Sequence, residues 1–363
     1  MILNTLPKED GFRMPGEFEP HEGCILIWPH RGDSWPYGGD AAKKVFRELV
    51  RLISESEQVT VCVPPSEYDK ARDFLPDDTE LIQVETDDSW ARDYAPTFVK
   101  KGNITRGINW CFNAWGGDYD GLYDYWANDD NLCPSLCTHE NVDMYDAHHF
   151  VMEGGAVHSD GQGTLITTES CLLSPGRNPH MTKEAIEETL CNYLGASKVI
   201  WLPEGIVNDE TNGHVDNICA FTSPGHVVLA FPEDKTDAQY EPSKKALDVL
   251  RASTDAAGNP IEVHLLPMPK PCLVTKHELD GLDLLNGEPV RTVGERLAAS
   301  YANFYIANKT VIVPGFDDDN DEVARRIIAE LFPDRRVVTL QSREVLIGGG
   351  NFHCLTQQIP KAE

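Results

Sequence analysis

A structural unit that recurs along the chain is the strongest constraint on its fold. Each copy begins with two β-rich runs around a turn, continues with an amphipathic helix and a short apolar strand, and ends in a polar or glycine-rich elbow. Turn-forming residues between runs that favour strands are typical of hairpins. Four hairpins are predicted in this way, and they turn at Gly102-Asn103, Asp160-Gly161, Pro224-Gly225 and Asn308-Lys309.

The helices and strands of the unit follow from hydrophobic periodicity. Apolar residues spaced three and four apart predict helices in four segments, DAAKKVFRELVRLISES, TKEAIEETLCNYLG, PSKKALDVLRAS and DEVARRIIAELF. Short apolar runs predict buried strands in QVTVCVP, KVIWLP, IEVHLLP and RVVTL. Gly195 directly follows the second helical segment, where glycine commonly ends a helix.

Polar residues recur in the elbows of successive units. Asp93 lies in one elbow, Glu153 in the next, His214 and Asp216 in a third, and Cys354 in the last. From 93 to 153 is 60 residues, from 153 to 214 is 61, and from 214 to 354 is 140, or two steps of 70. The elbow expected between His214 and Cys354, near LPMPKPCLV, has no evident polar motif.

This spacing indicates a ring of similar modules. A fixed period is the mark of a repeated supersecondary unit. With the N-terminal segment GCILIWPHRGDSW counted as part of another copy, the period predicts about five ββαβ modules. We expect one α/β domain over residues 1–363, with the elbow residues meeting at its centre. The alternative is a general α/β sheet in which the spacing is accidental.

The charge of the chain limits its partners. The net charge is −28 at pH 7, which argues against nucleic acid or an anionic membrane surface. An acidic surface aids solubility, and it would also attract a cationic substrate. No run approaches the roughly 20 apolar residues of a membrane span, and the N-terminus lacks the basic and apolar regions of a signal peptide. The cytoplasm is therefore the expected compartment.

Neither a metal nor an organic cofactor is expected. Ten cysteines are too few for a disulfide scaffold in 363 residues. Cys133, Cys137 and His139 are close in sequence, but zinc normally takes four ligands, and no second pair has a matching spacing. The run from Gly348 to Gly350 lacks the Lys-Ser/Thr of a phosphate-binding loop. It is better explained by the close approach of substrate or of a neighbouring strand.

The elbow residues suit a reaction at a guanidinium group. Cys354 and His214 are a candidate nucleophile and proton carrier. Three carboxylates accompany them, and these would repel the oxyanion of amide hydrolysis, which leaves a thiol protease as a weak alternative. Carboxylates instead bind a planar guanidinium through paired N–H···O bonds. The central carbon of that cation is electrophilic.

Local geometry separates the two candidate histidines. If His214 and Asp216 lie on a strand, both side chains point to the same face, and Gly213 permits close backbone approach. His353 and Cys354 are adjacent, so on a strand they would face opposite ways. We therefore expect His214 to be the working histidine and His353 to be a bystander.

These roles combine into a mechanism. Asp93 and Asp216 grip the guanidinium nitrogens, and the thiolate of Cys354 attacks the central carbon. His214 passes a proton to the departing amino group, ammonia leaves, and a covalent intermediate remains on the sulfur. Water activated by His214 then releases a ureido product, while Glu153 orients the histidine.

The motifs taken together resemble one family. The chain is similar, nearly end to end, to the agmatine deiminases of the guanidino-modifying (pentein) superfamily in DGFRMPGEFEPHEGCILIWP, SWARDYAPTF, NWCFNAWGG, EGGAVHSDG, DETNGHVDN and GGGNFHCLTQQIP. The resemblance implies a five-bladed α/β propeller with pseudo-fivefold symmetry. It also implies hydrolysis of agmatine to N-carbamoylputrescine and ammonia through a thiouronium on sulfur, in putrescine and polyamine biosynthesis. The family's nucleophile, histidine, paired aspartates and glutamate fall on Cys354, His214, Asp93 with Asp216, and Glu153.

The resemblance further implies that Trp90 and Glu210 contact the substrate, with Glu210 near the primary amine. The acidic residues beside the motifs suit a substrate with a cation at each end, and they are Asp87, Asp88, Asp209 and Glu210. The related arginine deiminases must bind an α-carboxylate, normally with arginine. The alternatives are an arginine or peptidylarginine deiminase and a non-catalytic binder of polyamines or guanidines. A homo-oligomer, either a dimer or a tetramer, is expected, and NWCFNAWGGDYDG is the candidate covering loop.

Overall fold

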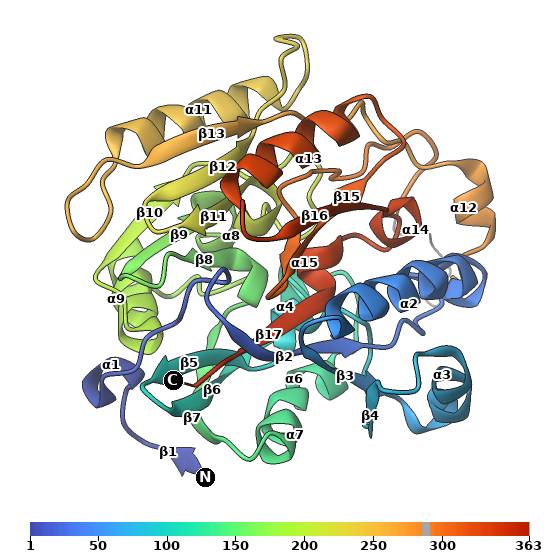
Figure 1. The fold of residues 1–363 in the computed structure, drawn as a ribbon, viewed down its shortest axis with the longest axis horizontal. Helices are drawn as coiled ribbons and strands as arrows, with labels where there is room; N and C mark the ends of the chain where they lie inside the picture. Colours follow the sequence, from blue (N-terminus) through green and yellow to red (C-terminus); the bar gives the residue numbers. More distant parts are fainter. Residues whose placement is uncertain (285–290, 363) are drawn as a thin grey trace.

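The strands of the protein are distributed over several small sheets. The computed structural model describes residues 1–284 and 291–362. Within these residues the strands form five separate sheets, two of four strands and three of three, and Figure 1 shows α4 and α15 lying between them. The strands are β1 (Ile2–Leu3), β2 (His21–Ile27), β3 (Gln58–Val63), β4 (Glu80–Gln83), β5 (Thr97–Lys101), β6 (Ile104–Cys111), β7 (Asp143–Val151), β8 (Val157–Ser159), β9 (Thr164–Thr168), β10 (Lys198–Leu202), β11 (Cys219–Ser223), β12 (His226–Ala230), β13 (Glu262–Leu266), β14 (Tyr305–Ile306), β15 (Thr310–Gly315), β16 (Arg336–Gln341) and β17 (Thr356–Pro360).

Each sheet contains an antiparallel pair and a further parallel strand. The sheet orders are β1-β7-β6-β5, β10-β9-β8, β11-β12-β13, β14-β15-β16 and β17-β2-β3-β4. The pairs β5–β6, β8–β9, β11–β12 and β14–β15 are antiparallel, and β7, β10, β13 and β16 then add in parallel. The four predicted hairpins, the strands predicted after the helices and the mixed α/β fold are confirmed.

The longer helices cross over between the hairpins and the parallel strands. The helices are α1 (Pro7–Asp10), α2 (Asp40–Ser54), α3 (Tyr68–Phe74), α4 (Ala91–Tyr94), α5 (Gly117–Asp120), α6 (Ala127–Asp130), α7 (Leu132–His139), α8 (Glu169–Leu172), α9 (Lys183–Leu194), α10 (Val215–Ile218), α11 (Tyr240–Ala252), α12 (Lys276–Asp280), α13 (Asn320–Leu331), α14 (Arg343–Leu346) and α15 (Phe352–Leu355), with 3-10 turns at η1 (Pro36–Gly39), η2 (Pro65–Glu67) and η3 (Gly154–Ala156). The four predicted helices are α2, α9, α11 and α13. In α9, the Thr182 hydroxyl accepts from the Ala185 amide, and Gly195 ends the helix at φ 64°, where glycine avoids the strain of other residues.

The two ends of the chain build one sheet together. β17 pairs antiparallel with β2, and β2 pairs in parallel with β3 after the crossover helix α2. The C-terminal strand therefore completes the unit whose remainder was predicted in the N-terminal segment. All residues of β17 are buried, and Figure 1 shows the C-terminus beside β5 and β6. The sheet ties residues near position 25 to residues near position 357.

The elbows are short helical turns and not strands. Asp93 lies in α4, and Glu153 directly precedes η3. His214 is the N-cap residue of α10, which contains Asp216, and Cys354 lies in α15. The expectation that His214 and Asp216 share a strand face is wrong, because Gly213 at φ 90° turns the chain into α10. His353 and Cys354 likewise occupy one turn of α15 and not a strand.

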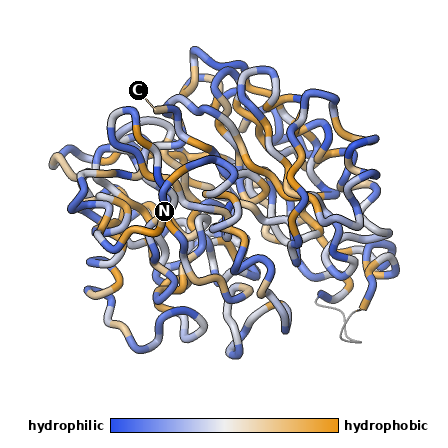
Figure 2. Tube along the Cα trace, turned by 90° about the horizontal axis from the view of Figure 1, so that it is seen from below, coloured by the Kyte–Doolittle hydropathy of each residue, from blue (hydrophilic) through white to orange (hydrophobic). Residues whose placement is uncertain are grey.

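Apolar side chains fill the space between the sheets and their helices. Figure 2 shows hydrophobic segments through the interior and hydrophilic segments along the outer loops. Cys24, Cys62 and Cys219 are fully buried among apolar residues, as predicted. Cys133 and Cys137 pack together as core residues. In the described part of the chain, no helix is long and apolar enough to span a membrane.

Removal of residues 356–363 is expected to unfold the protein or to lower its melting temperature by more than about 10 °C. β2 would lose a ladder of hydrogen bonds worth about 1 kcal/mol each, and the whole fold is stable by only about 5–15 kcal/mol. Circular dichroism melting would test this. The matched control removes residues 362–363 alone and should melt like the full chain. Equal melting of the two truncations would contradict the expectation.

Candidate active site

One pocket opens where the elbows meet. Its empty space, including the open solvent at its mouth, is about 560 Å³. Its wall combines residues from distant parts of the sequence, including Trp90, Asp93, Trp115, Glu210, Asn217 and Cys354. Cys354 is only 6 % exposed, and the predicted residues Glu153, His214 and Asp216 are at most 1 % exposed. The acidic and basic groups of this site therefore interact largely out of water.

Gly155 marks the point where three of the predicted residues converge. A Cβ atom built on this glycine would lie 2.6 Å from His214 Nδ1, 2.9 Å from Asp93 Oδ1 and 3.0 Å from Asp216 Oδ2. No side chain fits there. The second glycine of the MEGG segment is thus required by the packing of three side chains from three elbows.

Asp93 is held by two donors. Its Oδ2 accepts from the indole N–H of Trp115 at 2.8 Å, and its Oδ1 accepts from the backbone N–H of Gly155 at 3.0 Å. Trp115 lies in the predicted covering loop and has a positive φ of 62°. The loop therefore contributes a wall of the pocket and a hydrogen bond to its base.

His214 lies between two carboxylates. Its Nδ1 is 3.8 Å from Asp93 Oδ1, and its Nε2 is 3.8 Å from Glu153 Oε2. Glu153 is balanced by Arg177, whose Nε lies 2.7 Å from Glu153 Oε1 with both side chains fully buried. Arg177 was not predicted, since nothing in its local sequence distinguishes it from a surface arginine.

Cys354 is contacted by a residue from the elbow that lacked an evident motif. Asn303 Nδ2 lies 3.1 Å from Cys354 Sγ, and Asp216 Oδ2 lies 3.5 Å from the same sulfur. The Asn303 amide also donates to Asn217 Oδ1 at 3.0 Å. Asn303 comes just before β14, at the position that elbow residues occupy before other hairpins, and this position was the signal that could have identified it.

The glycine run allows two large rings to approach the pocket. A Cβ on Gly350 would lie 2.6 Å from the Trp90 ring, and one on Gly348 would lie 2.7 Å from the Trp35 ring. The two indoles stack with centroids 5.3 Å apart. These glycines do permit a close approach, but the neighbours are the side chains of two tryptophans and not the substrate or strand that the sequence predicted.

Burial and charge set the protonation of the site. Burial raises the pKa of the Cys354 thiol well above its usual range, and the charges of Asp216 and Asp93 add to the effect. Burial also raises the pKa of Asp93 to about 6. Burial opposes a charge on His214, but Asp93, Cys171 and Glu153 together outweigh it and raise the histidine pKa well above its usual value. The site thus pairs a neutral thiol with a charged imidazole.

The two remaining carboxylates are kept ionised by cations. Burial opposes the charge of Glu153, but Arg177 and His214 together outweigh burial and lower the pKa of this carboxyl. Burial likewise opposes the charge of Asp216, yet the hydrogen bond and charge of His353 lower its pKa. His353 is therefore in direct contact with the site, and the expectation that it is a bystander is wrong.

The outer part of the pocket is less uniformly acidic than expected. Glu210 lines it but forms an ion pair with Arg291. Arg31 also lines it and pairs with Asp33 at 2.5 Å. Neither arginine was predicted, and Arg291 lies 81 positions from the Glu210 that it joins.

Of the acidic residues predicted beside the motifs, Asp88 lines the pocket together with Glu210. It accepts from Ser34 at 2.7 Å, and burial raises its pKa to about 6. Asp87 instead accepts from Asn128, and Asp209 from Thr211, which makes both of them braces for loops.

Some clusters near the pocket have the composition of metal ligands. Two buried ones are Glu17 with His158 and His353, and Glu153 with Cys171 and His214. Arg92 lies 3.9 Å from Glu17, and Arg177 lies 2.7 Å from Glu153. These resident cations disfavour a divalent ion at either place.

Comparisons with known proteins agree over nearly the whole chain. The sequence profile of the Porphyromonas-type peptidyl-arginine deiminase family matches residues 13–360. A Selenomonas ruminantium protein assigned provisionally as an agmatine deiminase is 51% identical over 369 residues, covering 100% of both chains. A Listeria monocytogenes protein with a similar provisional assignment is 49% identical, covering 99% of this chain and 97% of its own. The solved agmatine deiminase of Enterococcus faecalis is 43% identical with a TM-score of 0.97, covering 99% of each chain.

The raised pKa of Cys354 predicts slow alkylation at neutral pH. In the protein without substrate, the rate at which iodoacetamide modifies Cys354 should go on increasing as the pH is raised beyond about 9, because the thiolate is the reactive form. In Asp216→Asn, which keeps an acceptor for His353 and removes a charge, the profile should move to lower pH. Site-resolved mass spectrometry measures both rates. A plateau below pH 8 in the unmodified protein would contradict the assignment.

Proposed function

The chain belongs to the Porphyromonas-type peptidyl-arginine deiminase family, and we propose that it hydrolyses agmatine to N-carbamoylputrescine and ammonia. It is then a hydrolase that acts on a carbon–nitrogen bond of a linear amidine. The observation that carries this proposal is the convergence at Gly155, where two aspartates and a histidine meet beside a buried cysteine. Such a site binds a planar cation and directs a sulfur nucleophile at it.

The residues divide the work as follows. Asp93 and Asp216 accept N–H bonds from the guanidinium, and Trp90 packs against the substrate. The arriving cation offsets the negative charges that help to hold the thiol protonated, so Cys354 releases its proton to solvent when substrate binds, and this proton balances the ammonia that leaves later. The thiolate then adds to the central carbon. In the free protein, by contrast, the nucleophile remains protected as a neutral thiol.

Proton transfer by His214 completes the cycle. The charged imidazole donates to the departing nitrogen, ammonia leaves, and a thiouronium remains on Cys354. The neutral imidazole then takes a proton from water, which attacks the same carbon and releases the ureido product and the cysteine. Glu153, itself held by Arg177, keeps the ring between the two carboxylates. No step in this scheme calls on a metal or an organic cofactor.

The far end of the substrate decides between agmatine and arginine. Arg31 and Arg291 are each already paired with a carboxylate, so neither offers an unopposed charge to an α-carboxylate. Arg291 contacts Oε2 of Glu210, and Oε1 is the oxygen that we assign to the primary ammonium of agmatine. An arginine or peptidylarginine deiminase is the alternative, and the name of the family gives it some support.

The wider setting follows from the same proposal. We infer that the five sheets are blades of a pseudo-fivefold α/β propeller and that residues 1–363 form a single catalytic domain. We further propose that the protein is a homo-oligomer, either a dimer or a tetramer, and that it is located in the cytoplasm. Its reaction then serves putrescine and polyamine biosynthesis. The net charge of −28 favours a cationic substrate over nucleic acid or an anionic membrane as partner.

Ammonia release tests the activity. The unmodified protein should release ammonia from agmatine, and Cys354→Ala should lose at least about 10⁴-fold of the rate, as removal of a covalent nucleophile does. Mass spectrometry of a quenched reaction should find the substrate carbon on Cys354. Faster turnover of arginine, or of a peptide with C-terminal arginine, would favour the alternative substrate. Tight agmatine binding without ammonia or adduct would identify a binding protein.

Glu210→Gln tests the amine end of the pocket. We expect KM for agmatine to rise about 10- to 100-fold, because one charge-assisted hydrogen bond is lost, with a smaller change in kcat. Butylguanidine, which lacks the terminal amine, is the matched substrate control and should be turned over equally by both proteins. An equal loss on both substrates would show that Glu210 acts only through Arg291 and the pocket wall.

A further inference from the structure

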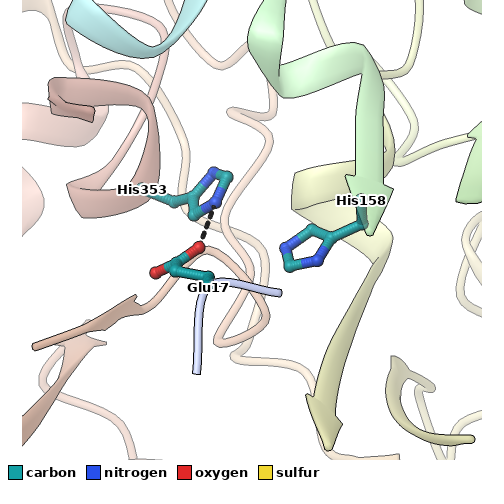
Figure 3. A group of neighbouring side chains, drawn as sticks. All are labelled: Glu17, His158 and His353. Atoms are coloured by element: carbon teal, nitrogen blue, oxygen red, sulfur yellow. Dashed lines mark hydrogen bonds and ion pairs between the residues drawn. The ribbon is translucent and has the colours of Figure 1, made fainter. Parts of the chain in front are cut away.

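A buried line of charged groups leads away from the pocket behind Asp216. His353 Nδ1 lies 2.8 Å from Asp216 Oδ2. His353 Nε2 lies 2.8 Å from Glu17 Oε2, and Figure 3 shows this second contact. The three residues are 1 %, 3 % and 4 % exposed in the order Asp216, His353, Glu17. Each nitrogen of the imidazole therefore meets a carboxylate oxygen in a place that water scarcely reaches.

The contacts place a proton on both ring nitrogens when both carboxylates are ionised. Ionised carboxylates only accept hydrogen bonds, so each nitrogen must donate and the ring must be an imidazolium. Burial and Arg92 oppose this charge, but Glu17 and Asp216 outweigh them and raise the pKa of His353. His158 stacks on the ring at 5.3 Å, and because burial and the His353 charge lower its pKa to about 4, it adds no second charge.

Glu17 is itself fixed from the opposite side. Its Oε1 accepts from the backbone N–H of Ile306 at 2.8 Å, and Arg92 lies 3.9 Å from its Oε2. The Nε of Arg92 donates to the carbonyl of His353 at 3.2 Å. His353 is thus held by contacts to its ring and by a contact to its own backbone carbonyl, and these contacts limit the positions that the ring can take.

Asp216 is arranged asymmetrically by this contact. Its Oδ2 accepts from His353, whereas its Oδ1 is buried and has no hydrogen-bond partner among the residues that the structure describes. A buried acceptor without a partner is costly unless something supplies a donor. The N–H groups of a bound guanidinium are the donors that fit a carboxylate.

We propose that His353 is a positioning residue which, as an imidazolium anchored on Glu17, keeps Asp216 ionised and aims its Oδ1 at the guanidinium of the substrate. The proposal rests on the proposed function for the identity of that substrate. His353 does not touch the reacting atoms, and it acts through Asp216. It belongs to the site although it points away from the cysteine that follows it in sequence.

The surrounding charges explain why such a residue is needed. The titratable or charged groups that face Asp216 and His353 from the neighbouring elements are Glu17, Arg92, Asp93, His158, His214 and Cys354. Asp216 competes for a cation with Asp93, because both lie at the Gly155 point. Without the imidazolium, either Asp93 or Asp216 is expected to bind a proton, since two carboxylates that share one site disfavour full ionisation of both.

The sign of the pH effect follows from this. His353 lowers the pKa of Asp216, so its loss should raise that pKa. Agmatine binding requires the ionised carboxylate, and the acid limb of kcat/KM should therefore move to higher pH. A shift of about one pH unit is the size expected when one nearby opposite charge is removed.

Two isosteric variants separate the two contacts of the ring. The amide nitrogen of asparagine replaces Nδ1, so His353→Asn can still donate to Asp216. The amide nitrogen of glutamine replaces Nε2, so His353→Gln can still donate to Glu17 and loses the bond to Asp216. KM for agmatine should rise about 10- to 100-fold in His353→Gln and less in His353→Asn, and the acid limb should move further in His353→Gln.

Binding without chemistry gives a second readout. In the Cys354→Ala background, His353→Gln should weaken agmatine binding in calorimetry by the factor seen in KM, whereas the melting temperatures of the two variants should be similar. Equal effects of the glutamine and asparagine variants on KM, binding and pH profile would overturn the proposal and leave a purely structural role. An unmoved acid limb in both variants would overturn it as well.

A measurement without substrate keeps this proposal distinct from the proposed function. In nitrogen-15 correlation spectra, the His353 ring should carry protons on both nitrogens at pH 7, with the signal assigned by its absence in His353→Gln. A neutral ring, or one metal ion per chain in elemental analysis of the protein, would overturn the proposal. Failure of the unmodified protein to release ammonia from agmatine would instead overturn the proposed function, while a doubly protonated ring would still support the anchoring of Asp216.

Discussion

Burial of several carboxylates around one glycine is the constraint on which the rest of the site depends. Asp93, Glu153 and Asp216 are at most 4 % exposed, and unpaired charges in such surroundings are strongly disfavoured. Each is therefore held by a separate partner. Glu153 has Arg177 and Asp216 has His353, whereas Asp93 accepts from two neutral N–H groups and has the His214 ring 3.8 Å away. Burial still raises the pKa of Asp93 to about 6, while the pKa values of the other two carboxyls are lowered.

The repeated architecture is what brings these groups together. A parallel strand in each unit ends in an elbow, and the elbows that place Asp93, Glu153, His214, Asn303 and Cys354 lie between the sheets. No single segment of sequence contains the site, so its geometry depends on the packing of all the units. The pairing of β17 with β2 matters in this context because it attaches the Cys354 elbow to the start of the chain.

The same buried charges link the proposed chemistry to its control. Burial raises the pKa of the Cys354 thiol, and the carboxylates that would bind a guanidinium add to this effect while the pocket is free. A cationic substrate relieves that repulsion, so the nucleophile would become reactive when its target is in place. His353 and Glu17 extend this arrangement by one further layer, since an imidazolium between two carboxylates sets the charge and orientation of Asp216.

Much of the protein could be predicted from sequence alone, and the failures have a common cause. Periodicity and turn residues determined the four hairpins, the crossover helices and the mixed α/β class, because these depend on neighbours within a few positions. The spacing of the elbows was enough to select the residues that converge at Gly155. Tertiary structure decided the rest. Gly213 turns the chain so that His214 and Asp216 lie on a helical turn, Asn303 fills the elbow without a motif, and Arg177 and His353 neutralise carboxylates far away in sequence. These contacts join residues from 24 (Arg177 and Glu153) to 137 (His353 and Asp216) positions apart, and only the packing of the units against one another determines which charge meets which.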